Sequence, residues 1–392
     1  MLNLNFITKK VEERVNEELK KILQSGDYRF DTHIHLINKD YMPKKYLSIR
    51  MPGLIDLDFL MSIDNLMDYF KEEKDSKLIN YAKFLHFISS NSIKEIAYNL
   101  INLYPKNTIF CALMLDFEMN IEGSKKFDVF RQMDDYRKIV NEFPGVFLPF
   151  VAIDPNNPMH TEIFNKAFSK EYNFFGIKIY PSMGFMPSHP NLMKIFEICE
   201  KYDIPVITHS GSGGVYNPKS PMQLEYFELD DGGRLKLVNQ KKNFFFRKQY
   251  SKFLGDPKHW EPVFAAFPNL RVNIAHFGGY TEWDENPFND KSTLFTVIDL
   301  MERYPNVYAD ISYIISQTGM SKKFLELYEN NEVVANKTLY GSDFHFLKIE
   351  GDFSRIRSKF QSEVGSKVMH KISVENPLKF LNLVKFAKKV DD

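Results

Sequence analysis

The chain has 392 residues, of which 44 % are apolar and 26 % charged, a globular composition that excludes a collagen-like or globally disordered protein. Its 51 basic and 51 acidic side chains cancel, which argues against a dedicated nucleic-acid-binding protein, since such proteins are usually strongly basic. The two cysteines, Cys111 and Cys199, lie in apolar runs and are expected to be reduced core thiols. The sequence therefore predicts neither a disulfide framework nor a cysteine-built zinc site.

The first predicted element is an N-terminal helix within residues 1–26. Apolar residues recur at helical spacing from Val11 to Leu23, and Ser25-Gly26-Asp27 marks the end of the helix. The segment is rich in charge and lacks the apolar core of a signal peptide, and no window of the chain approaches the roughly 20 apolar residues of a membrane span. A cytoplasmic protein with no membrane partner is expected.

Eight short apolar segments then alternate with segments of helical pattern. The predicted strands are Tyr28–Leu36, Thr108–Leu115, Val146–Ile153, Phe174–Tyr180, Pro205–His209, Leu270–His276, Val307–Ile311 and Thr338–Ser342. Strands that are apolar throughout and alternate with helices predict an α/β protein whose parallel sheet is covered on both faces. Eight strands are the number that closes a (β/α)8 TIM barrel, and a doubly wound open sheet is the alternative.

The chain is longer than the roughly 250 residues that such a barrel needs. No low-complexity linker or short repeat divides it, so residues 1–392 are interpreted as a single domain. The additional residues are assigned to the N-terminal helix, to a mostly helical insertion at about 38–105, and to a loop insertion at about 211–257.

Metal-binding residue types stand at the carboxyl ends of four predicted strands. His33 and His35 end the first, His209 the fifth and His276 the sixth, and Asp343 follows the eighth. Alternate residues of a strand point to one side, so His33 and His35 present two imidazoles together. Any one of these residues alone is more often a core residue or a helix cap. Because strand ends converge on the active-site face of a barrel, the five together favour one shared site.

The same residues lie in motifs that resemble the amidohydrolase superfamily, specifically the amidohydrolase-related branch that includes aminocarboxymuconate-semialdehyde decarboxylase. The resemblance spans about Tyr28 to Leu381. The matching segments are Asp31-Thr32-His33-Ile34-His35, Gly176-Ile177-Lys178-Ile179-Tyr180-Pro181, Pro205–His209, Asn273–Gly279, Asn306–Ser312 and Tyr340–Asp343. As a set, these motifs are specific for the superfamily but not for a substrate.

The resemblance implies a set of metal ligands and a reaction. His33, His35, His209 and Asp343 match ligand positions, and His276 matches either a second-metal ligand or a metal-free acid–base histidine. The implied cofactor is a divalent metal, with one Zn²⁺ favoured because imidazole and carboxylate suit zinc. The implied activity is hydrolysis of a C–N or C–O bond in an amide, lactone or cyclic imide, by a metal-activated water with Asp343 as general base and His276 stabilising the oxyanion.

Two other functions stay open at this point. A nonoxidative decarboxylase of an aromatic or muconate-like acid would use the same residues, and a catalytically silent metal-binding barrel would keep the ligands without the reaction. Lys178 bears on the metal number, because a carboxylated lysine there would bridge two metals, whereas a free lysine would pair with a carboxylate or a substrate anion.

The expected partner is a small-molecule substrate. Its pocket is assigned to Tyr180, Phe277, Trp283 and His345, which follow the strand ends. Barrel enzymes of this branch are often homodimers, and the sequence identifies no interface.

Overall fold

The computed structural model describes residues 10–41, 76–119, 128–213, 222–243, 247–279, 283 and 292–388. Eight parallel strands within these ranges form one sheet. Their order is β1 (Arg29–Ile34), β2 (Thr108–Leu113), β3 (Phe147–Ala152), β4 (Gly176–Ile179), β5 (Val206–Thr208), β8 (Val272–Ile274), β9 (Val307–Asp310) and β10 (Thr338–Leu339). All eight predicted strands are confirmed, and each is shorter than the apolar segment that predicted it.

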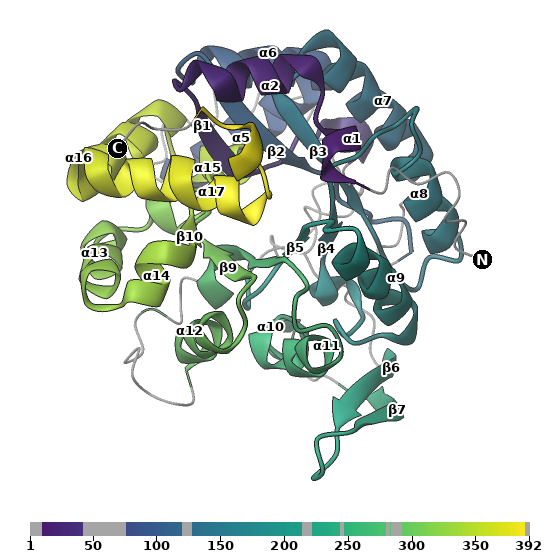
Figure 1. Ribbon diagram of the computed structural model, residues 1–392. Helices are drawn as coiled ribbons and strands as arrows, with labels where there is room; N and C mark the ends of the chain where they lie inside the picture. The colour runs from purple at the N-terminus through teal and green to yellow at the C-terminus, as the bar shows by residue number, and fades with distance from the viewer. Residues whose placement is uncertain are drawn as a thin grey trace.

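The sheet curls into a nearly closed barrel. Beyond the end of β10, the carbonyl of Tyr340 accepts hydrogen bonds from the backbone N–H and the hydroxyl of Thr32 in β1, both at 2.9 Å. These bonds join the first strand to the last. Figure 1 shows helices arranged as an outer ring around the strands. The (β/α)8 TIM barrel is therefore confirmed, and the open-sheet alternative is excluded.

The helices of the outer layer cover the sheet with their apolar faces. In α9, for example, Leu192, Ile195 and Phe196 are buried in the main apolar cluster between helices and strands. The helices are α5 (Ser76–Ser90), α6 (Ile93–Asn102), α7 (Val129–Glu142), α8 (His160–Ala167), α9 (Pro190–Lys201), α11 (Glu261–Ala266), α12 (Thr293–Arg303), α13 (Met320–Asn330), α14 (Glu332–Lys337), α15 (Phe344–Glu350), α16 (Phe353–His370) and α17 (Asn376–Phe380). In the described ranges, no helix is long and apolar enough to serve as a membrane span.

The N-terminal segment forms two helices where the sequence predicted one. α1 (Val11–Arg14) and α2 (Glu17–Ser25) are separated at Asn16, whose backbone is extended. The Asn16 side chain accepts a hydrogen bond from the backbone N–H of Leu19 at 2.8 Å, so it caps α2 rather than continuing α1. The apolar face is as predicted, because Val11, Val15, Leu19 and Leu23 are all buried.

A second apolar cluster joins this N-terminal segment to the interior of the barrel. It combines the apolar face of α1 and α2 with alternate residues of the strands, among them Ile109, Cys111, Leu113, Leu148 and Phe150. Lys178 and Asp310, from β4 and β9, are buried but polar. One end of the barrel interior is therefore filled by this apolar cluster, which we call the apolar floor. Buried polar residues such as Lys178 and Asp310 are not part of it. Cys111 in this floor and Cys199 in α9 are buried free thiols, as predicted.

The region from 211 to 257 contains more structure than the predicted loop. β6 (Met222–Leu229) and β7 (Leu235–Lys242) form an antiparallel hairpin that projects from the barrel (Figure 1), and α10 (Arg247–Leu254) follows. Buried Met222, Leu224 and Tyr226 alternate with exposed Gln223 and Glu225, which is the two-residue period of a strand. Residues 42–75 of the predicted helical insertion, and 214–221 and 244–246 of this one, lie outside the described residues.

Candidate metal centre

The five residues selected at strand ends are all buried. Four of them, His33, His35, His276 and Asp343, belong with Asp310 to two overlapping groups of possible metal ligands. His33, His35 and Asp343 have ligand atoms within 4.8 Å of one another, and so do His33, His276 and Asp310. His33 belongs to both groups, so the hydrogen bonds of its two ring nitrogens decide which group suits a metal.

The first group leaves matching nitrogen atoms for a metal. His33 Nδ1 lies 2.9 Å from Asp310 Oδ2, and His35 Nδ1 lies 2.9 Å from the carbonyl of Leu113. Both Nδ1 atoms are therefore engaged as donors, which leaves the Nε2 atoms as ligands. His35 Nε2 lies 3.7 Å from Asp343 Oδ1, so the carboxylate faces the same point.

The carboxylate of Asp343 is placed to bind a cation. Its Oδ1 atom is buried without a hydrogen-bond partner. Burial raises the pKa of Asp343 to about 8, although the positive charge of Lys178 opposes this shift. A buried carboxylate oxygen without a partner is costly, and a divalent ion between Asp343 and the two imidazoles would remove that cost. This donor set fits a divalent metal.

Asp343 is not used as a helix cap, which was the alternative reading of this residue. It occupies the N-cap position of α15, but its side chain makes no capping hydrogen bond. Its backbone is left-handed, with φ of 57°, and its N–H donates to the carbonyl of His33 at 2.7 Å. The preceding turn approaches β1 closely, because a Cβ on Gly341 would lie 2.6 Å from Cβ of His33. The strained turn thus aims the Asp343 carboxylate at the histidines.

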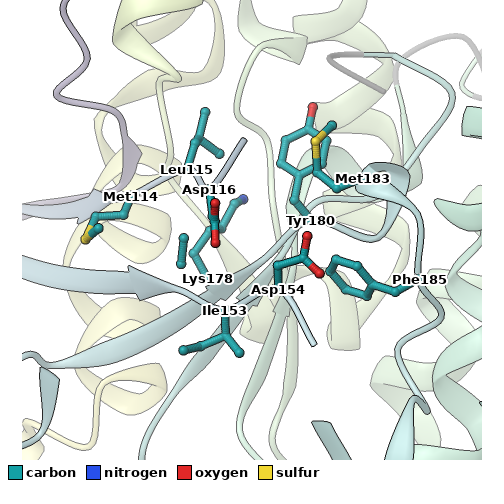
Figure 2. Close-up of a pocket in the computed structure, with 10 residues that line it drawn as sticks. Met114, Leu115, Asp116, Ile153, Asp154, Lys178, Tyr180, Met183 and Phe185 are labelled. Atoms are coloured by element: carbon teal, nitrogen blue, oxygen red, sulfur yellow. The ribbon is translucent and has the colours of Figure 1, made fainter. Parts of the chain in front are cut away.

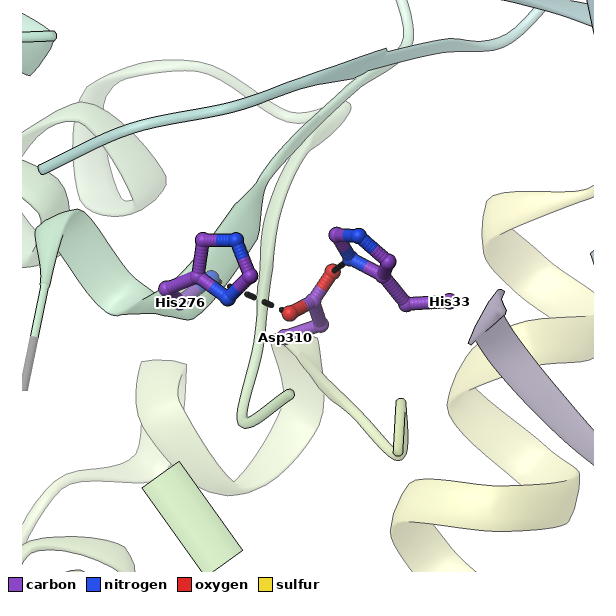
Figure 3. A group of neighbouring side chains, drawn as sticks. All are labelled: His33, His276 and Asp310. Carbon is purple, nitrogen blue, oxygen red and sulfur yellow. Dashed lines mark hydrogen bonds and ion pairs between the residues drawn. The ribbon is translucent and has the colours of Figure 1, made fainter. Parts of the chain in front are cut away.

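Asp310 organises the second group, and the sequence analysis gave it no role. Figure 3 shows its carboxylate between His33 and His276. Oδ2 accepts from Asn273 Nδ2 at 2.7 Å as well as from His33, and Oδ1 accepts from the backbone N–H of His276 at 3.0 Å. The hydroxyl of Ser312 also donates to Oδ1. Burial raises the pKa of Asp310, but His33 and these donors outweigh it and hold the pKa well below its usual range.

His209 and His276 form a pair beside the first group. His276 Nε2 lies 3.2 Å from His209 Nδ1, and His209 Nε2 lies 3.1 Å from the carbonyl of Gly213. The ring of Tyr180 stacks on His209 with centroids 4.1 Å apart. His209 is not in either ligand group, so its role as a metal ligand stays a prediction. His276 has φ of 59° within the turn η6 (Ala275–Gly278), which directs its ring toward His209.

Lys178 lies at the border between the metal centre and a cavity. Its ammonium is buried without a hydrogen-bond partner, and burial lowers its pKa to about 8 while Asp310 and Asp343 oppose this shift. The cavity is small and lies at the carboxyl ends of β2, β3 and β4 (Figure 2). Lys178 and Tyr180 both line it.

The other residues assigned to the substrate pocket lie elsewhere. Phe277 and Trp283 pack edge to face on each other with centroids 5.4 Å apart, and both are buried. His345 lies among aromatic rings, and the centroid of its ring is 5.8 Å from that of Phe87 and 6.3 Å from that of Phe84. None of the three lines the cavity, so their contact with a substrate stays a prediction.

The position of Asp310 predicts a loss of metal affinity when its charge is removed. Asp310→Asn keeps the size of the side chain but replaces one of its two accepting oxygens by an amide nitrogen, which would face either His33 and Asn273 at the place of Oδ2 or Ser312 at the place of Oδ1. Loss of such an orienting partner of a metal-binding histidine is expected to weaken metal affinity by about 10- to 100-fold. Competition with a fluorescent chelator measures the affinity. Unchanged affinity would show that Asp310 does not position His33.

A family model described as Amidohydrolase matches residues 124–383, which is more than half of the chain. No curated protein sequence matches it.

Similar solved structures include enzymes of two kinds. The 2,6-dihydroxybenzoate decarboxylase from Rhizobium has a TM-score of 0.54 and 15 % identity, over 91 % of this chain and 99 % of that one. A dihydroxybenzoic acid decarboxylase from a Polaromonas species, with bound manganese and the inhibitor 2-nitroresorcinol, has a TM-score of 0.52 and 15 % identity, over 91 % and 97 %. A probable 2-pyrone-4,6-dicarboxylic acid hydrolase from Acinetobacter baumannii, with bound citric acid, has a TM-score of 0.50 and 11 % identity, over 91 % of this chain and 99 % of that one. Identities this low establish a shared fold only.

Proposed function

The chain belongs to the amidohydrolase family, and from this premise we propose that it is a metal-dependent enzyme that hydrolyses a C–N or C–O bond of a small molecule. The observation that carries the proposal is the convergence of His33, His35 and Asp343 within 4.8 Å, with a buried oxygen of Asp343 left without a partner. An amide, a lactone or a cyclic imide is the proposed substrate class.

In this proposal Nε2 of His33, Nε2 of His35 and the carboxylate of Asp343 would hold the ion. His209 would join them only through Nδ1, in place of its contact with His276. One Zn²⁺ is proposed, because imidazole and carboxylate suit zinc. When bound, such a metal supplies Lewis acidity and lowers the pKa of a water molecule to about 7. The chain itself supplies the groups that orient the reactants and move the proton.

Each of these groups has a defined task. Asp343 accepts a proton from the attacking water and returns it to the leaving group. Asp310 keeps His33 in the tautomer that offers Nε2 toward the centre. The Nδ1 of His276 lies 2.8 Å from the hydroxyl oxygen of Ser312. In its protonated form, His276 would stabilise through Nε2–H the negative charge that develops on the substrate oxygen. Lys178 adds a positive charge on the cavity side.

One observation favours a second candidate, a nonoxidative decarboxylase. The ammonium of Lys178 is buried, borders the cavity and has no hydrogen-bond partner, so it could bind the carboxylate of an aromatic acid. The same metal site would then polarise the substrate. The two reactions differ in whether a water oxygen enters the product.

Isotope labelling separates these candidates. The metal-loaded protein is incubated in H₂¹⁸O with a panel of amides, lactones, cyclic imides and aromatic acids, and the products are analysed by mass spectrometry. Hydrolysis is expected to place one ¹⁸O in the organic product. Release of carbon dioxide with no ¹⁸O in the organic product would replace hydrolysis by decarboxylation. Turnover that is equal without metal would contradict both.

A further inference from the structure

The short segment that follows β5 is bound to the end of α10. This segment, residues 210–213, continues directly from His209 of the metal centre. The carbonyl of Gly255, the first residue after α10, accepts a hydrogen bond from the hydroxyl of Ser210 at 2.7 Å and another from the backbone N–H of Gly211 at 3.0 Å. The insertion that contains the hairpin and α10 therefore contacts the chain immediately beside a candidate metal ligand.

The backbone contacts of this segment leave no room for side chains. A Cβ on Gly255 would lie 2.4 Å from the carbonyl oxygen of Gly211. A Cβ on Gly211, whose φ is 104°, would lie 2.7 Å from the carbonyl oxygen of Gly278 in the turn η6, which also contains His276. Only glycine permits such close approaches. The segment is thus packed between the turn after α10 and the turn after β8, and a shift of either turn displaces it.

Gly213 connects this packing to the imidazole of His209. Its carbonyl oxygen lies 3.1 Å from His209 Nε2 and also accepts from the hydroxyl of Ser251 in α10, at 3.4 Å. A carbonyl oxygen only accepts hydrogen bonds, so in the neutral imidazole the proton is on Nε2 and the lone pair is on Nδ1. The ring of Tyr180 stacks on the imidazole with an angle of 6° between the two planes, which fixes the plane of the ring.

The hairpin in turn holds α10 in place. Tyr250 and Leu254 of α10 are buried in one apolar cluster with Leu224 and Tyr226 of β6. The hydroxyl of Tyr250 donates to the sulfur of Met222, also in β6, at 3.0 Å. Helix and hairpin form one packed unit, so the positions of the polar atoms at the end of α10 follow from the packing of the whole insertion.

We propose that Ser251 and Gly255 are positioning residues for His209. Through the carbonyl of Gly213, they hold the imidazole in the tautomer that carries its proton on Nε2 and presents Nδ1 toward the metal centre. The tautomer of a metal-binding histidine is set by the hydrogen bond of its other ring nitrogen, and loss of that bond weakens metal binding. The inference rests on the proposed function for the role of His209 as a ligand, whereas the tautomer exists without metal.

The tautomer can be measured in the absence of metal and substrate. Metal-free protein with ¹⁵N-labelled histidines is studied by long-range ¹H–¹⁵N correlation at a pH where the imidazoles are neutral, and the signals of His209 are assigned by their loss in His209→Gln. His209 is expected to carry its proton on Nε2. A proton on Nδ1, or a mixture of the two tautomers, in the unaltered protein would overturn the inference.

Gly255→Ala tests whether the end of α10 sets this tautomer. The added Cβ forces the turn away from Gly211, so His209 is expected to become a mixture of tautomers. Metal affinity, measured by chelator competition, is expected to fall by about 10- to 100-fold. Gly232→Ala is the matched control, because only side-chain atoms lie within 4 Å of a Cβ at this position of the hairpin turn, and it should change neither quantity. A folded Gly255→Ala protein that melts at a lower temperature but keeps the tautomer and the metal affinity would show that α10 has a structural role only.

Ser251→Ala provides a second test, and decides the question if Gly255→Ala does not fold. Loss of its single hydroxyl contact is expected to give the same mixture of tautomers and to lower metal affinity by about 3- to 10-fold. Ser362→Ala is its control, because it removes an exposed hydroxyl that also donates to a backbone carbonyl, that of Lys359. An unchanged tautomer in Ser251→Ala would overturn the assignment of this residue. Metal content and ¹⁸O incorporation are measured separately, so a protein with the expected tautomer but no hydrolysis contradicts the proposed function and not the positioning of His209.

Discussion

Removal of divalent metal is expected to reduce turnover to below about 1 % and to lower the melting temperature, and re-addition is expected to restore both. The buried Oδ1 of Asp343 has no hydrogen-bond partner, and its carboxylate lies close to the ligand atoms of His33 and His35. Without a metal, this buried polar oxygen stays uncompensated, which costs stability. A ligand at 1,000 times its Kd stabilises the folded state by about 4 kcal/mol. Activity and thermal unfolding are followed while metal is titrated into chelator-treated protein.

The endpoint of this titration also reports the metal number. One equivalent at full activity is expected for a single ion held by His33, His35 and Asp343, and two equivalents would indicate that Lys178 is carboxylated and bridges a pair. His33→Ala should prevent recovery at any metal concentration. His370→Ala, which changes an exposed histidine outside the site, should recover fully. Full activity of the protein after all metal has been removed would contradict the metal centre.

The barrel could be predicted because its pattern is local in sequence. Each strand is a short apolar run, and the residue types at the strand ends are visible wherever the run stops. His33, His35, His276 and Asp343 were selected in this way, and the structure places them at one rim. The strands themselves end earlier than predicted, because the apolar runs continue into the turns that carry the site, as at η6.

The contacts that depend on distant parts of the chain could not be predicted. Asp310 acts through residues that are 277 and 37 positions away, His33 and Asn273, so no local spacing reveals it. The signal available was its place at the end of β9, the same kind of position that selected the histidines. The prediction of a loop at 211–257 was wrong for a different reason. The alternation of buried and exposed residues that marks β6 of the hairpin was present in the sequence, but the region was expected to be a loop.

Asp343→Asn is expected to lower kcat by about 10²- to 10⁴-fold while the protein keeps its fold. The amide has the size of the carboxylate, and its oxygen can still face the metal, but it cannot take a proton from water. The left-handed backbone of residue 343 tolerates asparagine as readily as aspartate, so the turn after β10 should persist. Replacing a buried carboxylate by a neutral group also removes a desolvation cost, so the metal-free variant should unfold at the same or a higher temperature. Steady-state kinetics, metal content and thermal unfolding are measured together.

Asp352→Asn is the matched control for this substitution. Asp352 stands at the N-cap of the next helix, α16, where its side chain accepts from the backbone N–H of Arg355 at 2.8 Å. Asparagine caps helices as well as aspartate, so this variant should keep full activity and stability. The two aspartates occupy the same position relative to a helix, but only Asp343 makes no capping bond. If Asp343→Asn retained full metal and full turnover, the carboxylate would not be the general base, and the reaction would require another proton acceptor at this rim.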